Sequence, residues 1–357
     1  MASLRRIIHG SIAAISVVSI SFGSSAAEKT IELADGSTVM AEYGRVFVPE
    51  RRDRSNGEYI SLRYIKVLGG SAVTGSPIIY LRGGPGVSGT ALLGTKRFAA
   101  LFHGIARGRD VVLFDQRGTG ETKPRLHCGP PVRLPMIPAP TSNKILETTR
   151  KYASNCAGRL REQGIDLAAY NTNESADDVA DLAGHLGYDR VMLFGMSYGS
   201  HLGLTVIRRH KDLIELAILG FVVGPDDIFR RPLQFDSVLS KLDAIAQDRK
   251  SGWPYSEPPS VTLEQSLKRF DKPMRSSRTN KSGRVIEVEI NRTDVEISFL
   301  WDLWENNRTS WQSFPDVIDK LRDRDISNLA ERIRGVRTIA RNPMRSAMLC
   351  SSGVSAQ

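Results

Sequence analysis

Short apolar runs separated by glycine-rich turns recur along the first part of the chain. They read PIIYL at 77–81, DVVLF at 110–114 and RVMLF at 190–194, and their length and β-branched content predict buried strands. Segments with helical periodicity lie between them, at 96–105 and 175–186. Strands that alternate with helices indicate an α/β fold with a mostly parallel sheet flanked by helices.

Two further segments, at 42–50 and 58–67, alternate apolar and polar residues and are joined by a polar turn. This pattern predicts an antiparallel hairpin at one edge of the sheet. A last apolar run, LAILGFVV at 216–223, predicts a sixth strand.

Beyond that strand the pattern changes. Residues 228–345 lack the strand-turn-helix rhythm, and segments such as 233–247 and 317–334 favour helices of mixed polarity. A polar, poorly patterned break lies around 276–284. We expect this insertion of helices after the sixth strand to form a lid.

The N-terminus has the pattern of a signal peptide. Two arginines precede an apolar segment at 12–22, and the small residues Ser25, Ala26 and Ala27 follow it. The apolar segment is too short to cross a bilayer core of about 30 Å, so no stable membrane anchor is expected after cleavage. The sequence therefore predicts an exported protein, periplasmic or extracellular, that begins near Glu28.

Length and composition indicate one large globular domain, or one domain with an insertion. Hydrophobic residues make up 41 %, which is ample for a core. The net charge of +10 comes from basic residues scattered among acids, without an aromatic-interleaved basic patch, so nucleic-acid binding is not expected. Cys128 and Cys156 flank a proline-rich stretch, and a disulfide between them is expected in an oxidising compartment. Cys350 is left over. No cofactor and no metal site is predicted.

The segment 195–199 reads G-M-S-Y-G between a predicted strand and a predicted helix. This is the pattern of a nucleophile elbow, a sharp turn that raises a serine oxygen clear of the sheet. The turn crowds the backbone, so glycine is needed two residues before and two after the serine. Ser197 is therefore the predicted nucleophile.

Two more glycine-rich turns, LRGGPG at 81–86 and DQRGTG at 115–120, each close a strand of their own. Together with GMSYGS at 195–200 they resemble the α/β-hydrolase fold, and within it the proline iminopeptidase and tripeptidyl aminopeptidase branch of serine hydrolases. The resemblance covers about 42–225 well and the lid loosely. Arg82 stands where many relatives carry histidine.

The resemblance implies a role for several of these residues. Ser197 is the nucleophile, the backbone N–H of Tyr198 is one oxyanion donor, and an N–H from the loop of Gly83 and Gly84, with Gly84 as the donor, is the other. Asp115 and Arg117 are expected to brace the loop rather than to do chemistry.

The triad acid and histidine are not found in the chain. In this fold the order is Ser, then Asp or Glu, then His, and only His201 and His210 follow Ser197, on or at the end of the elbow helix. Asp226 and Asp227 are weak candidates for the acid, and a cap on the first lid helix is the favoured interpretation of both. The stretch 342–357 resembles the segment before the seventh strand, so the chain is expected to be C-terminally truncated, without strands 7 and 8.

The expected organisation is a signal peptide at 1–27, a core with strands 1 to 6 at 28–225, a helical lid at 226–345 and the truncated start of the C-terminal core portion at 346–357.

The expected function is an exported serine hydrolase of the aminopeptidase type that cleaves N-terminal residues from short peptides through an acyl-enzyme. Two alternatives stay open: a catalytically dead remnant that binds, and an esterase or lipase acting on an ester. Lid acids that could hold a substrate ammonium include Asp302 and Glu305, although an amphipathic helix is the favoured interpretation of that segment. The oligomeric state is not predicted.

Overall fold

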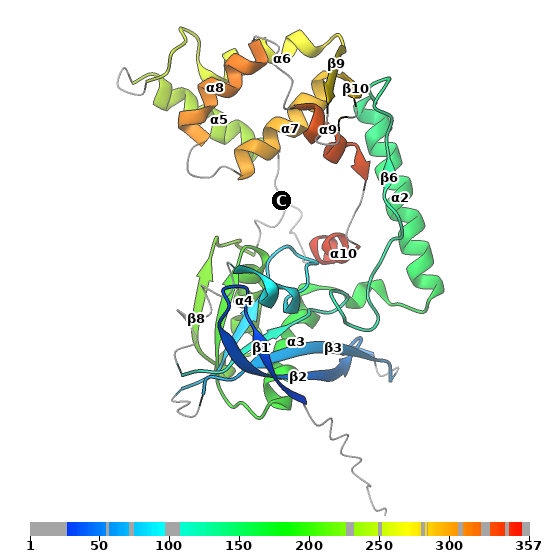
Figure 1. Ribbon diagram of the computed structural model, residues 1–357, viewed down its shortest axis with the longest axis vertical. Coiled ribbons are helices and arrows are strands. Elements are labelled where there is room, and N and C mark those ends of the chain that lie inside the picture. The colour runs from blue at the N-terminus through cyan, green and yellow to red at the C-terminus, as the bar shows by residue number, and fades with distance from the viewer. Residues whose placement is uncertain are drawn as a thin grey trace, which may run out of the picture.

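A seven-stranded sheet forms the lower part of the computed structural model (Figure 1). The structure describes residues 27–54, 57–70, 75–96, 108–225, 232–248, 252–279, 283, 285–305, 310–322, 329–339 and 343–351. In spatial order the strands are β1 (Ala27–Glu32), β2 (Thr38–Pro49), β3 (Tyr59–Val67), β5 (Val111–Phe114), β4 (Ile78–Leu81), β7 (Val191–Met196) and β8 (Ile214–Gly220). The first three are antiparallel, β5 is antiparallel to β3, and the last four run parallel to one another.

The predicted α/β class and the predicted strands are confirmed. The hairpin of 42–67 is β2 paired with β3, and the apolar runs form β4, β5, β7 and β8. Every residue of β4 and β5 is buried, as expected for central parallel strands. The strand β1 was not predicted; it lies directly at the expected cleavage site near Glu28.

Helices cover the sheet. The helix predicted at 175–186 is α3 (Thr172–His185), and the elbow helix is α4 (Tyr198–Arg209). A long helix that the sequence did not predict, α2 (Ser142–Glu162), buries only Tyr152, Cys156 and Leu160, which recur every four residues along one face. The helix expected at 96–105 lies almost entirely outside the described residues.

The second part of the molecule, in the upper half of Figure 1, follows β8 in the chain, where the sequence leads us to expect an insertion; we refer to its residues 232–339 as the insertion. Its helices are α5 (Pro232–Ala246), α6 (Pro259–Leu267), α7 (Arg292–Glu305), α8 (Ser310–Arg322) and α9 (Leu329–Val336). They share a separate apolar core that includes Phe270, Phe314 and Ile318. The last helix, α10 (Pro343–Ser351), lies back against the lower part, where Met344 and Met348 join the main core.

One expectation about the insertion was wrong. It is not all helical, because β9 (Met274–Thr279) and β10 (Val285–Ile290) form an antiparallel pair where the sequence indicated a polar break. The helix predicted over 317–334 falls on the end of α8 and on most of α9, and residues 323–328 lie outside the described residues. A short pair, β6 (Val132–Arg133) with β11 (Thr338–Ile339), ties the insertion to the chain after the 115–120 turn.

None of the helices in the described parts of the chain has the length and apolar character needed to cross a membrane.

Candidate active site

Ser197 lies at the junction of β7 and α4. Its backbone has φ 56° and ψ −125°, one of two positive φ values among the described residues other than glycine. A left-handed conformation at a serine costs free energy and persists only where the surroundings enforce it. The N–H of Ser197 donates to Gly220 O at 3.0 Å, which anchors the turn to the end of β8.

The glycines of the turn are required by close backbone contacts. A Cβ at Gly195 would lie 2.4 Å from Gly199 O, and a Cβ at Gly199 would lie 2.0 Å from Leu81 O. Both distances are far inside van der Waals contact. The steric reason that the sequence offered for the G-x-S-x-G spacing therefore holds in the structure, and the second glycine also lets α4 approach the end of β4.

The turn after β4 meets the Ser197 turn directly. A Cβ at Gly83 would be 2.6 Å from Met196 O and 3.2 Å from the Cβ of Ser197. Gly84, with φ 134°, adopts a conformation that other residues avoid. The structure thus brings together Ser197, the start of α4 at Tyr198, and the loop of Gly83 and Gly84. Because Tyr198 begins the helix, its N–H is one of the donors left without an intrahelical partner.

Asp115 contacts the residues that follow the Gly83–Gly84 loop. Its buried carboxylate accepts hydrogen bonds from Ser88 Oγ at 2.7 Å, from the N–H and hydroxyl of Thr90 at 3.0–3.1 Å, and from the N–H of Glu121 at 2.9 Å. A Cβ at Gly120 would strike the same carboxylate. These contacts join the 115–120 turn to Ser88 and Thr90, a few residues after Gly84, and the expectation that Asp115 braces the Gly83–Gly84 loop stays a prediction.

Gln116 contributes a contact that the sequence did not reveal. Its Nε2 donates to Arg82 O at 2.9 Å. In a trans peptide the C=O and the following N–H point in opposite directions, so this bond directs the N–H of Gly83 away from Gln116. The only sequence signal is the polar amide at the second position of DQRGTG, which by itself does not indicate a partner.

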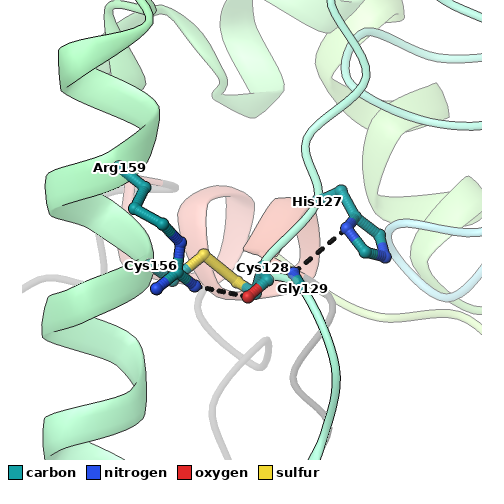
Figure 2. The surroundings of a disulfide bond; sticks show 5 residues. All are labelled: His127, Cys128, Gly129, Cys156 and Arg159. Atoms are coloured by element: carbon teal, nitrogen blue, oxygen red, sulfur yellow. Dashed lines mark hydrogen bonds between the residues drawn. A yellow bond between two sulfur atoms is a disulfide. The ribbon is translucent and has the colours of Figure 1, made fainter.

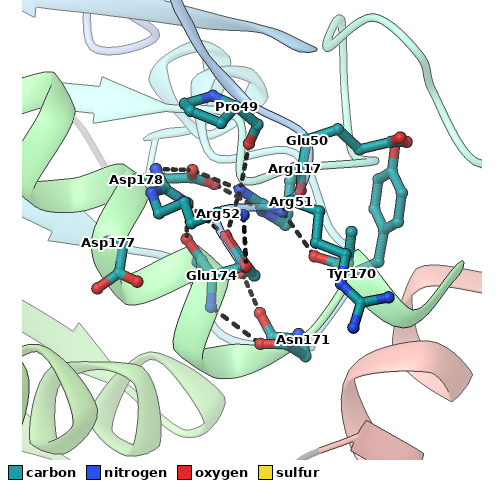
Figure 3. A network of polar contacts seen from close by, with 12 residues as sticks. Pro49, Glu50, Arg51, Arg52, Arg117, Tyr170, Asn171, Glu174, Asp177 and Asp178 are labelled. Atoms are coloured by element: carbon teal, nitrogen blue, oxygen red, sulfur yellow. Dashed lines mark hydrogen bonds and ion pairs between the residues drawn. The ribbon is translucent and has the colours of Figure 1, made fainter. Parts of the chain in front are cut away.

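Arg117 points away from the loop and into a network with α3 (Figure 3). Its guanidinium is fully buried and donates to both oxygens of Asp178, at 2.6 and 2.8 Å, and to the carbonyls of Glu50 and Ala169. Arg52 shares Asp178 at 3.0 Å. Arg117 thus fixes the 115–120 turn to β2 and α3, and the expectation that it braces the Gly83–Gly84 loop itself is not met by any direct contact among the described residues.

Comparison with known proteins agrees with this geometry. Residues 76–220 match the family model described as the alpha/beta hydrolase fold. The chain has an α/β-hydrolase core. It is 25 % identical over 296 residues to serine protease Hip1 of Mycobacterium tuberculosis, covering 78 % of this chain and 56 % of that protein. It is 29 % identical over 190 residues to a tripeptidyl aminopeptidase of Streptomyces lividans, covering 51 % and 35 %. The matched region thus spans about half, or less, of the length of these relatives.

No imidazole contacts the Ser197 hydroxyl within the described parts of this α/β-hydrolase core. His201 is buried one turn along α4, and its Nδ1 faces Gly224 O at 3.2 Å; burial lowers its pKa. His210 Nε2 lies 2.7 Å from Asp177 Oδ1. His185 packs on the ring of Tyr64. His127 Nδ1 accepts the N–H of Gly129.

Cys128 and Cys156 lie at disulfide distance (Figure 2), with their Cα atoms 4.9 Å apart, and the disulfide expected from the sequence stays a prediction. The pair lies between the segment after the 115–120 turn and α2. Arg159, one turn further along α2, donates to Cys128 O. The lone Cys350 falls in α10, and its side chain lies outside the described ones.

Several candidate residues cannot be placed. Asp226 and Asp227 lie outside the described residues, as do the side chains of Asp302 and Glu305. Within the described residues, no group of three His, Cys, Asp or Glu side chains has an arrangement suited to a metal ion.

Proposed function

We propose that the protein is a serine hydrolase in which Ser197 is the nucleophile. The observation that carries the proposal is the positive φ of Ser197 at the strand-to-helix turn, with Gly83 packed against it. In such a site the serine oxygen attacks a carbonyl carbon, and the acyl-enzyme is then hydrolysed by water. The N–H groups of Tyr198 and of Gly84 or Gly83 are the proposed oxyanion donors, each worth about 3 kcal/mol of barrier.

Within this class we propose an exported aminopeptidase that acts on the N-termini of short peptides. The support is the kind of relative that the chain matches, a serine protease and a tripeptidyl aminopeptidase. Export is supported by the signal-peptide pattern at 1–27 and by the pairing of Cys128 with Cys156. The organisation into a core at 28–225 and a lid from 226 stays part of the proposal.

The general base is proposed not to be among these 357 residues, because in this fold it follows the serine in the chain and only His201 and His210 follow Ser197. All four described histidines have partners other than Ser197, and a serine without a base is a poor nucleophile. The same observation favours a second candidate function, a binding protein that keeps the pocket of a hydrolase and does not turn over.

Covalent labelling tests the assignment of Ser197. A fluorophosphonate reacts with an elbow serine by losing fluoride from phosphorus, and tandem mass spectrometry locates the adduct. We expect slow labelling confined to Ser197 and absent from Ser197→Ala, with Ser142→Ala, a change at an exposed serine of α2, as the matched control. Labelling at other serines with Ser197 unmodified would refute the assignment. Parallel assays with an aminoacyl arylamide and an aryl ester then separate peptidase from esterase.

A further inference from the structure

A pocket of about 490 Å³ lies in the insertion, on elements separate from the Ser197 turn. Three segments line it: β6 with the residues after it, the first half of β10, and the end of α9 with the start of β11. We call it the β10 groove. Its lining residues are Arg133, Leu134, Met136, Val285, Ile286, Glu287, Arg334, Arg337 and Thr338.

One wall of the β10 groove is a strand edge with open backbone groups. Further along β10, the N–H of Glu289 donates to Met136 O at 3.0 Å, so this residue directs its backbone groups away from β9. In an antiparallel pair the direction repeats every second residue. The N–H and C=O of Val285 and Glu287 therefore also point away from β9 and toward the groove. Within the described parts of the chain, no backbone group hydrogen-bonds to this stretch of the edge.

The floor of the β10 groove is rigid. Arg337 is 1 % exposed, and its guanidinium donates to both oxygens of Asp294, at 3.1 and 2.6 Å. It also donates to the carbonyls of Pro135, Met136 and Glu289. All five N–H donors of Arg337 are engaged and its charge is balanced. This residue holds the walls together and is not available to a ligand.

Two arginines that line the β10 groove add positive charge to it. Arg133 and Arg334 are both exposed, and neither has an ion pair with a carboxylate in the described parts of the chain. The walls between them and β10 are partly apolar, with Leu134, Met136 and Ile286. An open strand edge, an apolar wall and two free guanidinium groups together match an extended chain that ends in a carboxylate.

We propose that the β10 groove binds the C-terminal end of an extended peptide, which adds a strand to β10 along Val285–Glu287. The backbone of the peptide pairs with the open N–H and C=O groups, and its terminal carboxylate is held by Arg133 and Arg334. The site is independent of Ser197, and it holds whether or not the proposed hydrolase activity is found.

Binding is tested with a fluorescent, N-blocked pentapeptide of alternating threonine and valine, as the free acid and as the C-terminal amide. By fluorescence anisotropy on the full chain, we expect the amide to bind about five-fold more weakly, a typical loss for one exposed charge-assisted contact. Arg133→Gln and Arg334→Gln should each weaken the free acid and not the amide. Arg150→Gln, a change at an exposed arginine of α2, is the matched control.

Backbone pairing has its own test at Glu287. Proline there removes the N–H that faces the groove and leaves the bonds to β9 intact, so Glu287→Pro should weaken binding about ten-fold or more. Glu287→Ala also lacks the carboxylate that lines the groove but keeps the N–H, so it is the reference against which binding by the proline variant is compared. If the proline variant unfolds, a peptide with N-methyl groups on alternate residues replaces it. Any of three results would overturn the proposal: equal binding by Glu287→Pro and Glu287→Ala, equal binding of the N-methylated and unmethylated peptides, or equal binding of the free acid and the amide. An absence of binding would overturn it as well.

Discussion

Replacing Arg117 by alanine tests how the 115–120 turn is held. The guanidinium lies at 0 % exposure between β2, α3 and the turn, and it donates to Asp178, Glu50 O and Ala169 O. Its removal leaves a carboxylate that is 1 % exposed with Arg52 as its remaining partner at 3.0 Å, and it leaves two carbonyls without this donor.

The expected cost follows from that uncompensated charge. Breaking a buried ion pair by removing one partner typically costs about 3 to 5 kcal/mol. Because Arg52 still contacts Asp178, we expect the lower part of this range for Arg117→Ala. Even so, this is a large share of a typical net stability of about 5 to 15 kcal/mol. Arg117→Lys keeps the charge without the bidentate geometry, so its free energy of unfolding should lie between those of the wild type and Arg117→Ala.

Urea unfolding followed by far-ultraviolet circular dichroism measures the effect. Arg150→Ala, on the exposed side of α2, is the control and should change the free energy of unfolding by less than about 0.5 kcal/mol. A loss below about 1 kcal/mol for Arg117→Ala would show that the network in Figure 3 does not hold the turn.

Three further outcomes are expected. Protein from an oxidising host, unfolded without reductant, should show one free thiol, at Cys350; three thiols would mean that the loop cysteines are not joined. The strand β8 is an edge of the sheet in the described structure, with Leu216 and Ile218 exposed by 47 and 46 %. We therefore expect the chain to associate as its concentration rises in sedimentation velocity, and the double variant Leu216→Lys with Ile218→Lys to associate less. A monomeric wild type would contradict the expectation. Burial lowers the pKa of His201 from its usual 6.5. As the pH falls, this histidine therefore takes up a proton in the unfolded chain before it does so in the folded one, and stability is lost below about pH 6.5. Between pH 7.5 and 5.5 the urea midpoint should fall less for His201→Gln than for the wild type, and an equal fall would refute this.

The sequence predicted the parts of the fold that local sterics decide. The central strands are short and apolar on both faces. The glycines in the turns after β4 and β7 meet backbone atoms, and those in the turn after β5 meet side chains. Such turns leave a signal in the sequence because no other residue fits. The position of Ser197 could be predicted for the same reason.

The parts that the sequence did not predict depend on distant contacts. The strand β9 reads MRSSRT and has no apolar alternation; it forms because it pairs with β10. The hydrogen bond from Gln116 to Arg82 joins residues 34 positions apart, and no local sequence pattern predicts it. The same holds for the β10 groove, whose three walls come together only in the folded chain.

The most direct measurement of the central claim is the turnover of an aminoacyl arylamide by the 357-residue chain and by Ser197→Ala. Ser197 is the proposed nucleophile, but no described imidazole contacts it. Loss of the base in triad enzymes costs several orders of magnitude in turnover. We expect trace hydrolysis by the wild type, together with the slow labelling of Ser197 described above. Turnover of ordinary triad-enzyme size that Ser197→Ala abolishes would contradict the account of the missing base, and His201→Ala would then identify whether that histidine supplies it.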